Sequence, residues 1–178
     1  MKGYLLRLWS FFDPFYFKCT RLCYVFDQTE RRTVFRVRVT RYKGKPVVLN
    51  DGTRINKNDL LLKIHLHNAQ LLQELITIKS EMKRAVYIYH QIKQDMPELA
   101  KFMQLHQQCA HLKGIIGITS LYRGADRLGF NIVPIKSHFY RMFKQGAFLF
   151  INLFTVNTKK QKPVYLFMSK EQLFSKYL

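Results

Sequence analysis

Residues 51–68 constrain the fold most, because a polar turn in this segment is followed by a stretch whose alternate side chains differ in character. In residues 60–67, apolar side chains occupy the even positions, and Lys63, His65 and His67 follow on the odd ones. Successive side chains of a strand point to opposite faces of a sheet. The spacing therefore predicts a strand with one apolar side and one basic side.

A second segment, residues 34–41, has the same alternation. Phe35, Val37 and Val39 are separated by Arg36 and Arg38. An antiparallel sheet with one face on a core and one face in water shows this pattern. We therefore expect a second strand whose apolar face is buried and whose cationic face is solvated.

Turn and capping signals delimit the remaining elements. Asp51 and Gly52 predict a hairpin turn between strands at residues 47–49 and 53–55. Asn68 suits the N-cap of a long helix ending near Asp95, and Pro97 suits the first turn of another helix. The other predicted elements are amphipathic helices within residues 1–28, the end of the second long helix at Gly114, strands at 115–120, 130–135 and 164–168, a helical turn at 125–129, a helix from Ser137 to about residue 154, and a final helix capped by Ser169 with Gln172.

The length and composition are typical of one folded domain. The chain has 178 residues, of which 48% are hydrophobic, so apolar burial can offset the entropy of ordering it. Strands and helices do not alternate regularly along the chain. This order predicts a single α+β domain over residues 1–178, with a mixed or largely antiparallel sheet and helices packed on it.

The charge is strongly positive and unevenly distributed. The formal net charge is +19, and residues 31–45 contain seven cations and no acid. Such a surface attracts polyanions, which means nucleic acid, an anionic cell-wall polymer or an anionic membrane surface. The seven cations are Arg31, Arg32, Arg36, Arg38, Arg41, Lys43 and Lys45.

Cysteine usage favours a reducing compartment. Cys19, Cys23 and Cys109 are an odd number without paired spacing, so a disulfide framework is not expected. We therefore expect a cytoplasmic protein, with a peripheral position at the inner membrane surface as an alternative. No transmembrane helix is expected, because the apolar run at residues 145–158 is shorter than the roughly 20 residues of a span. The N-terminal amphipathic helices suit an anionic membrane or packing on the sheet, and we favour packing.

The basic strand faces supply the candidate site. Arg36, Arg38, Lys63 and His65 are expected to bind an anion, with Arg127 as a second anion contact or a partner for a carbonyl. No catalytic constellation or cofactor motif stands out, so we expect a non-catalytic binding module. The candidates for structural or pocket-lining roles are Asn68, Asp51, Gly52 and Gly129.

A metal site is the alternative use of the histidines. His65 and His67 point the same way on a strand, but Lys63 shares their side and would oppose a dication. We therefore predict no metal site. A third ligand would have to come from His90, His106, His111 or His138.

Three phrases carry a resemblance to a known family: DGTRINKNDLLLKIHLHN, YRGADRLGF and VYLFMSKEQLFSKY. They resemble the small bacterial YkoP-like family, whose domain also occurs appended to polysaccharide deacetylases, from about Arg36 onward. The resemblance implies an accessory domain connected with carbohydrate or envelope metabolism, and it assigns no role to any residue. The matching residues are Asp51, Gly52, His65, Asn68, Arg127, Leu128, Gly129, Phe130, Met168, Ser169, Lys170, Leu173 and Tyr177.

The order of elements is also similar to that of the GNAT acyltransferases, with the phrase ADRLGF at a helix-to-strand junction. That resemblance implies transfer of an acyl group from coenzyme A. The glycine-rich loop that would receive the pyrophosphate is replaced here by HLHNAQLLQ, which contains no glycine. An acyltransferase is therefore the alternative to a binding module.

Overall fold

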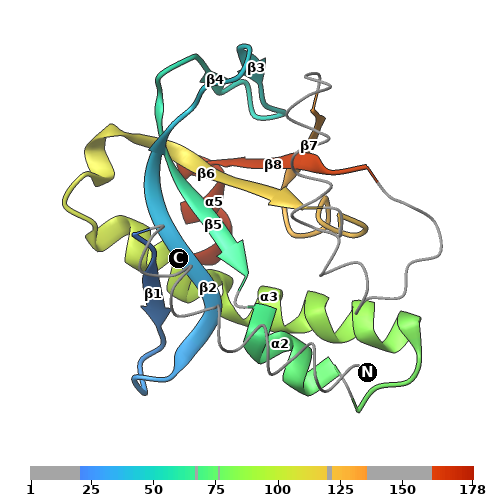
Figure 1. The fold of residues 1–178 in the computed structure, drawn as a ribbon. Coiled ribbons are helices and arrows are strands. Elements are labelled where there is room, and N and C mark those ends of the chain that lie inside the picture. The colour runs from blue at the N-terminus through green and yellow to red at the C-terminus, as the bar shows by residue number, and fades with distance from the viewer. Residues whose placement is uncertain (1–20, 67, 76, 120–121, 136–161) are drawn as a thin grey trace.

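The computed structural model describes residues 21–178 except residues 67, 76, 120–121 and 136–161. Six described strands form one sheet in the order β1-β2-β5-β6-β8-β7 (Figure 1). β5 and β6 are parallel, and every other neighbouring pair is antiparallel. The strands are β1 (Cys23–Phe26), β2 (Arg32–Arg41), β5 (Leu60–Leu66), β6 (Leu112–Thr119), β7 (Asn131–Pro134) and β8 (Val164–Ser169).

This mixed sheet with helices packed on it confirms the predicted α+β class. The described helices are α2 (Asn68–Leu75), α3 (Glu81–Leu105), the short 3₁₀ helix η1 (Cys109–His111) and α5 (Lys170–Tyr177). The predicted helix at Ser137 lies outside the described residues. No helix in the described part of the chain is long and apolar enough to cross a bilayer.

The two parallel strands at the centre of the sheet, β5 and β6, are paired over only part of their length. Paired residues run from Leu60 and Leu112 to Lys63 and Ile116, whereas β5 continues to residue 66 and β6 to residue 119. The two strand ends then point in different directions (Figure 1). The carboxyl ends of these strands are therefore separated, with α2 directly following β5.

Two helix boundaries differ from the prediction. The expected long helix from Asn68 is divided, because α2 ends at Leu75 and α3 begins after Ser80, whose hydroxyl accepts a hydrogen bond from the backbone N–H of Lys83 at 3.4 Å. A serine side chain at this position satisfies a free amide and favours a new helix start. The predicted boundary at Asp95 is wrong, since α3 runs on through Pro97.

Burial on the sheet explains why Pro97 does not end α3. The residues around it on the inner side of the helix, Met96, Leu99, Ala100 and Met103, are fully buried. They pack with the apolar side chains of β2, β5, β6 and β8. Proline inside a helix costs about 3 kcal/mol, and burying even two large apolar side chains stabilises by a comparable amount. We call this side of the sheet the helical face.

The opposite face of the sheet is covered on one half by a two-stranded hairpin. β3 (Val47–Val48) pairs with β4 (Arg54–Ile55), which confirms the predicted hairpin. Ile55 packs in a second core with Ile116 and Phe167. The ring of Tyr42 meets that of Phe167 edge-on, with centroids 5.5 Å apart. The other half of this face, over β2 and β5, carries the basic side chains.

At the N-terminal edge of the sheet, the helix predicted to reach residue 28 is wrong for residues 23–26, which form β1. The predicted residues before Arg21 lie outside the described chain. β1 pairs with β2 through an irregularity, because Tyr24 is opposite Arg36 whereas Phe26 is opposite Arg32. Local helical periodicity was outweighed here by pairing with the long neighbouring strand.

The irregularity in β2 is held from the helical face. The backbone N–H of Val34 donates a hydrogen bond of 2.7 Å to the carboxylate of Asp95 in α3, and Asp95 is buried. Burial raises the pKa of Asp95, while the hydrogen bond from Val34 acts in the opposite direction. The Asp95 carboxylate thus accepts the hydrogen bond from the Val34 amide that a backbone carbonyl of the neighbouring strand would accept in a regular sheet.

Candidate anion-binding site

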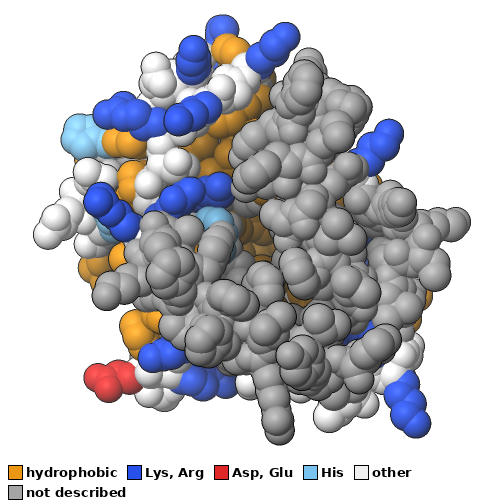
Figure 2. All heavy atoms as spheres, viewed as in Figure 1, with side chains coloured by type: hydrophobic (Ala, Val, Ile, Leu, Met, Phe, Trp, Pro, Cys, Tyr) orange, Lys and Arg blue, Asp and Glu red, His pale blue; other side chains and the backbone are white. Residues whose placement is uncertain are grey.

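Strand register brings the predicted basic residues of β2 and β5 together. Arg36 lies opposite His65, and Arg38 lies opposite Lys63. Opposing side chains on one face of an antiparallel pair are about 5 Å apart at their Cβ atoms. We call Arg36, Arg38, Lys63 and His65 the basic cluster. Lys, Arg and His side chains gather in Figure 2 where Figure 1 shows β2 and β5.

The members of the basic cluster differ in exposure. Arg36 is 2% exposed, whereas Arg38, Lys63 and His65 are half-buried. The expected solvated face is therefore wrong at Arg36. Its guanidinium donates a hydrogen bond of 3.1 Å to the hydroxyl of Tyr24 and lies 5.0 Å from the centroid of that ring. Arg36 therefore contacts Tyr24 and is almost completely withdrawn from solvent.

An aromatic edge adjoins the basic cluster, and sequence reasoning missed it. Tyr24 and Phe26 lie on β1 with ring centroids 6.3 Å apart, and Phe26 is 50% exposed. The exposed Arg32 places its guanidinium carbon 4.4 Å from the centre of the Tyr24 ring. The i, i+2 spacing of Tyr24 and Phe26 was the available signal, but a helix prediction for this segment obscured it.

Arg127 lies on the other side of the sheet. The Nζ of Lys176 donates to the backbone carbonyl of Arg127 at 3.0 Å, and the Tyr177 hydroxyl donates to the carbonyl of Leu128 at 2.8 Å. Both donors belong to α5, which packs on the helical face through Leu173. The structure therefore does not bring the exposed Arg127 together with the basic cluster.

Gly129 ends the turn that carries Arg127. It has a φ of +94°, and its amide donates to the carbonyl of Asp126 at 2.9 Å. An added Cβ would lie 3.2 Å from the Met168 side chain. Gly129 therefore has a structural role in closing the turn against α5.

Asp51 connects the hairpin turn to the start of α5. Its carboxylate accepts hydrogen bonds from the hydroxyl of Ser169 and from the backbone N–H of Thr53, the latter at 2.9 Å. The Ser169 oxygen also accepts from the backbone N–H of Gln172 at 3.0 Å, which confirms the predicted cap. Partial burial acts to raise the pKa of Asp51, but the hydrogen bonds outweigh it and lower the pKa below its ordinary value.

The rest of the hairpin turn is also fixed. Gly52 has a φ of +84°, which the turn requires, and its amide donates to the carbonyl of Leu49 at 3.0 Å. The amide of Asn50 donates to the side-chain oxygen of Asn131 in β7 at 2.8 Å. Asp51 and Gly52 are thus structural. Asn68 is the first residue of α2, which gives it the position expected of a helix start.

The histidines do not assemble into a metal site in the described chain. No group of three His, Cys, Asp or Glu side chains gathers among the described residues. His65 belongs to the basic cluster, and His67 lies outside the described residues.

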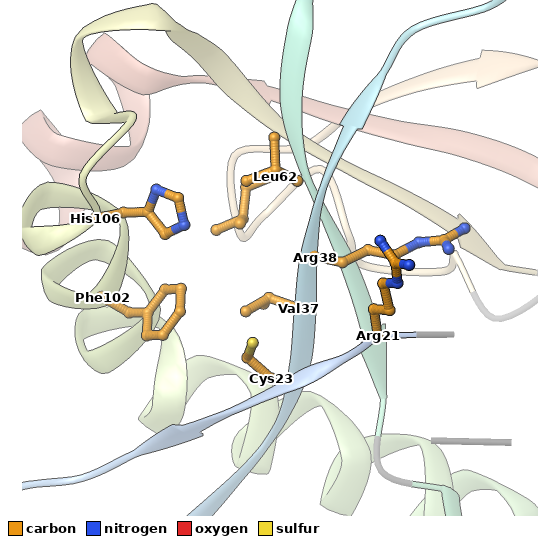
Figure 3. A pocket seen from close by; sticks show the side chains of 8 residues that line it. Arg21, Cys23, Val37, Arg38, Leu62, Phe102 and His106 are labelled. Atoms are coloured by element: carbon orange, nitrogen blue, oxygen red, sulfur yellow. The ribbon is translucent and has the colours of Figure 1, made fainter. Parts of the chain in front are cut away.

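Two cavities are lined by described residues, and the lining of the first includes Arg38 of the basic cluster. In the first, of about 250 Å³, Figure 3 shows Cys23, Val37, Phe102 and His106 turned toward a common space, and Arg21 and Arg38 also contribute to its lining. The second cavity, of about 370 Å³, lies between β4 and α5. It is lined by Thr53, Arg54, Asn56, Ala110, Leu112, Lys113, Lys170 and Glu171.

The family model described as "YkoP domain" matches residues 2–177 of the chain. The chain is 42% identical over 186 aligned positions to the "Uncharacterized protein YkoP" of Bacillus subtilis (strain 168). That match covers 99% of this chain and 98% of the relative. No solved structure matches the chain.

Proposed function

The chain belongs to the YkoP domain family, and we propose that it is a non-catalytic accessory module that binds an anionic polymer through the basic cluster. The observation that carries the proposal is the register of β2 and β5. It places Arg38 opposite Lys63 and Arg36 opposite His65 on one face of the sheet. Four basic side chains on two adjacent strands form a local concentration of positive charge.

Electrostatics supports an anionic ligand at this face. Like charges at opposing positions of two strands repel each other. An anion along the face lowers that repulsion and gains charge-assisted hydrogen bonds from the half-buried Arg38 and Lys63. The net charge of +19 adds long-range attraction for polyanions.

The location that we propose is cytoplasmic, at or near an anionic inner membrane surface. Cys23 and Cys109 are free thiols, and Cys23 is exposed. Exposed free thiols are typical of proteins in a reducing compartment. Nucleic acid, an anionic cell-wall polymer and an anionic membrane are the ligand classes that this chemistry fits.

Salt-dependent binding tests the proposal. A labelled oligonucleotide, anionic vesicles and a teichoic-type polymer are titrated with the full chain from 50 to about 300 mM salt, a range in which phosphate contacts weaken strongly. We expect binding to at least one probe that falls with salt. Absence of salt-sensitive binding to all three refutes the proposal.

Variants localise the binding. Lys63→Gln and Arg38→Gln are each expected to weaken binding and to reduce the salt slope by about 0.7–0.9 for each phosphate that the variant no longer neutralises. Lys93→Gln, an exposed cation on α3, is the matched control and is expected to leave the slope unchanged. Equal effects of all three variants would place the binding outside the basic cluster. Thermal unfolding of each variant checks that the fold is intact.

Acyl transfer from coenzyme A is the second candidate function. The parallel β5–β6 pair, paired only as far as Lys63 and Ile116 and followed by α2, is the observation that favours it. Ligands of open sheets bind outside the carboxyl ends of such strands. This candidate predicts that coenzyme A raises the unfolding temperature of the chain, and an unchanged temperature at millimolar coenzyme A would eliminate it.

A further inference from the structure

The aromatic edge beside the basic cluster narrows the class of ligand. Phe26 is half-exposed on β1, and its ring lies 6.3 Å from that of Tyr24, which is stacked against the exposed Arg32 at 4.4 Å. These planar groups lie at the outer edge of the sheet. Phosphate recognition alone needs no such groups, since cations suffice for it.

The arrangement joins two kinds of chemistry on one sheet face. Tyr24 lies opposite Arg36 in the register of β1 and β2, and Arg36 in turn lies opposite His65 of β5. From β1 across to β5, the aromatic side chains of β1 are therefore followed by Arg36 and Arg38 of β2, and then by Lys63 and His65 of β5. Proteins that bind single strands combine a cationic path for the backbone with aromatic rings on which the bases stack.

Tyr24 and Phe26 have different roles in this arrangement. The Tyr24 ring is held by the hydrogen bond from Arg36 at 3.1 Å and by the guanidinium of Arg32. These two contacts fix the orientation of the Tyr24 ring beside Phe26. Phe26 is 50% exposed, so it is the aromatic side chain of this edge that a ligand can reach.

We propose that the ligand of this face is a single-stranded nucleic acid, with a base stacked on Phe26 beside Arg32 and the phosphates along Arg38 and Lys63. The proposal rests on the proposed function and specifies its ligand. A membrane surface is the rival class, but insertion into a bilayer uses several apolar side chains together. Phe26 is the one exposed large hydrophobic residue in the described parts of β1, β2 and β5.

The test compares probes that differ only in their bases. A labelled oligothymidine of twelve nucleotides and an abasic oligodeoxynucleotide of the same length are titrated with the full chain at fixed salt. We expect the oligothymidine to bind about 5- to 150-fold more tightly, which is the range for stacking of one base. Phe26→Ala is expected to remove most of this difference and to leave the affinity for the abasic probe unchanged.

Controls separate stacking from folding. Phe26→Trp restores a ring and is expected to restore the preference for bases. Leu105→Ala changes an 84% exposed apolar residue at the end of α3 and is expected to have no effect on either probe. Unchanged unfolding temperatures of the Phe26 variants show that the effect arises at the binding surface.

The outcomes distinguish this inference from the proposed function. Equal, salt-sensitive affinity for both probes, with no effect of Phe26→Ala, overturns the inference and leaves polyanion binding intact. Binding of phosphatidylglycerol vesicles that depends on Phe26, without preference for bases, overturns it in favour of a membrane. Absence of salt-sensitive binding to these probes and to the teichoic-type polymer refutes both proposals.

Discussion

Ser169 links the hairpin turn to the last helix, and its substitution gives the sharpest test of the structure. The side chain is fully buried, donates to the carboxylate of Asp51 and accepts from the amide of Gln172 at 3.0 Å. Ser169→Ala removes both interactions while changing the volume by one oxygen atom. The Gln172 amide loses its cap, and the Asp51 carboxylate loses a donor.

The expected magnitude follows from these two losses. A lost N-cap costs about 1 kcal/mol, and a lost hydrogen bond to a charged group costs about 1.5 kcal/mol. The free energy of unfolding should therefore fall by about 2.5 kcal/mol. For a chain of this size that corresponds to a drop in Tm of roughly 5–10 °C.

Urea unfolding followed by circular dichroism measures the change. Ser175→Ala is the matched control, because Ser175 is an exposed serine of the same helix whose hydroxyl donates to the Gln172 carbonyl at 3.2 Å. The control should stay within about 0.5 kcal/mol of the wild type. If Ser169→Ala is as stable as the control, the coupling of turn and helix is refuted.

The pH dependence gives an independent check on the same residues. Because the folded pKa of Asp51 is lowered, its carboxylate stabilises the fold above the ordinary pKa of 3.8, and that contribution is lost as the pH falls through the lower folded pKa. Ser169→Ala removes one cause of the lowering. The variant should therefore lose less stability than the wild type on acidification through this window.

Asp95→Asn keeps an oxygen acceptor for the Val34 amide and removes a buried charge. Because burial raises the folded pKa of Asp95, the wild type loses stability as the pH rises from the ordinary pKa of 3.8 through the raised pKa. The stability of the variant relative to the wild type should therefore increase over that pH window, as measured by urea unfolding at a series of pH values. Gly114→Ala should destabilise the fold by about 3 kcal/mol, since an added Cβ would lie 2.2 Å from the backbone oxygen of Met168. Gly52→Ala should cost only about 1 kcal/mol, because the site has free space and the φ of +84° is the sole strain. Equal costs for the two glycine variants in denaturant titrations would contradict the contact geometry.

Alternation of side chains was enough to predict β2, β5 and the two sides of each strand, although not the burial of Arg36. The signal is local, because two successive residues of a strand necessarily face opposite sides. Arg38 and Lys63 could each be assigned on this ground to the basic side of its own strand. That they lie opposite each other depends on the register between distant strands, which neither segment encodes alone.

Other features depend on tertiary contacts and were not predictable from local pattern. Residues 23–26 have helical spacing of apolar side chains, but they form the strand β1 by pairing with β2. Pro97 signals a helix start, yet the buried residues on both sides of it keep α3 continuous. The burial of Arg36 under its own hydrogen bond to Tyr24 likewise follows from the pairing of β1, which the sequence did not predict.

The position of β8 within the sheet has a consequence for synthesis of the chain. β8 (Val164–Ser169) pairs on one side with β6 and on the other with β7, although both precede it in sequence. Among the described strands, β6 has an open edge and β7 has no neighbour until the ribosome has added β8. Completion of the sheet therefore depends on the synthesis of β8, and until then the edges of β6 and β7 that pair with it are open to chaperones or to association with other chains.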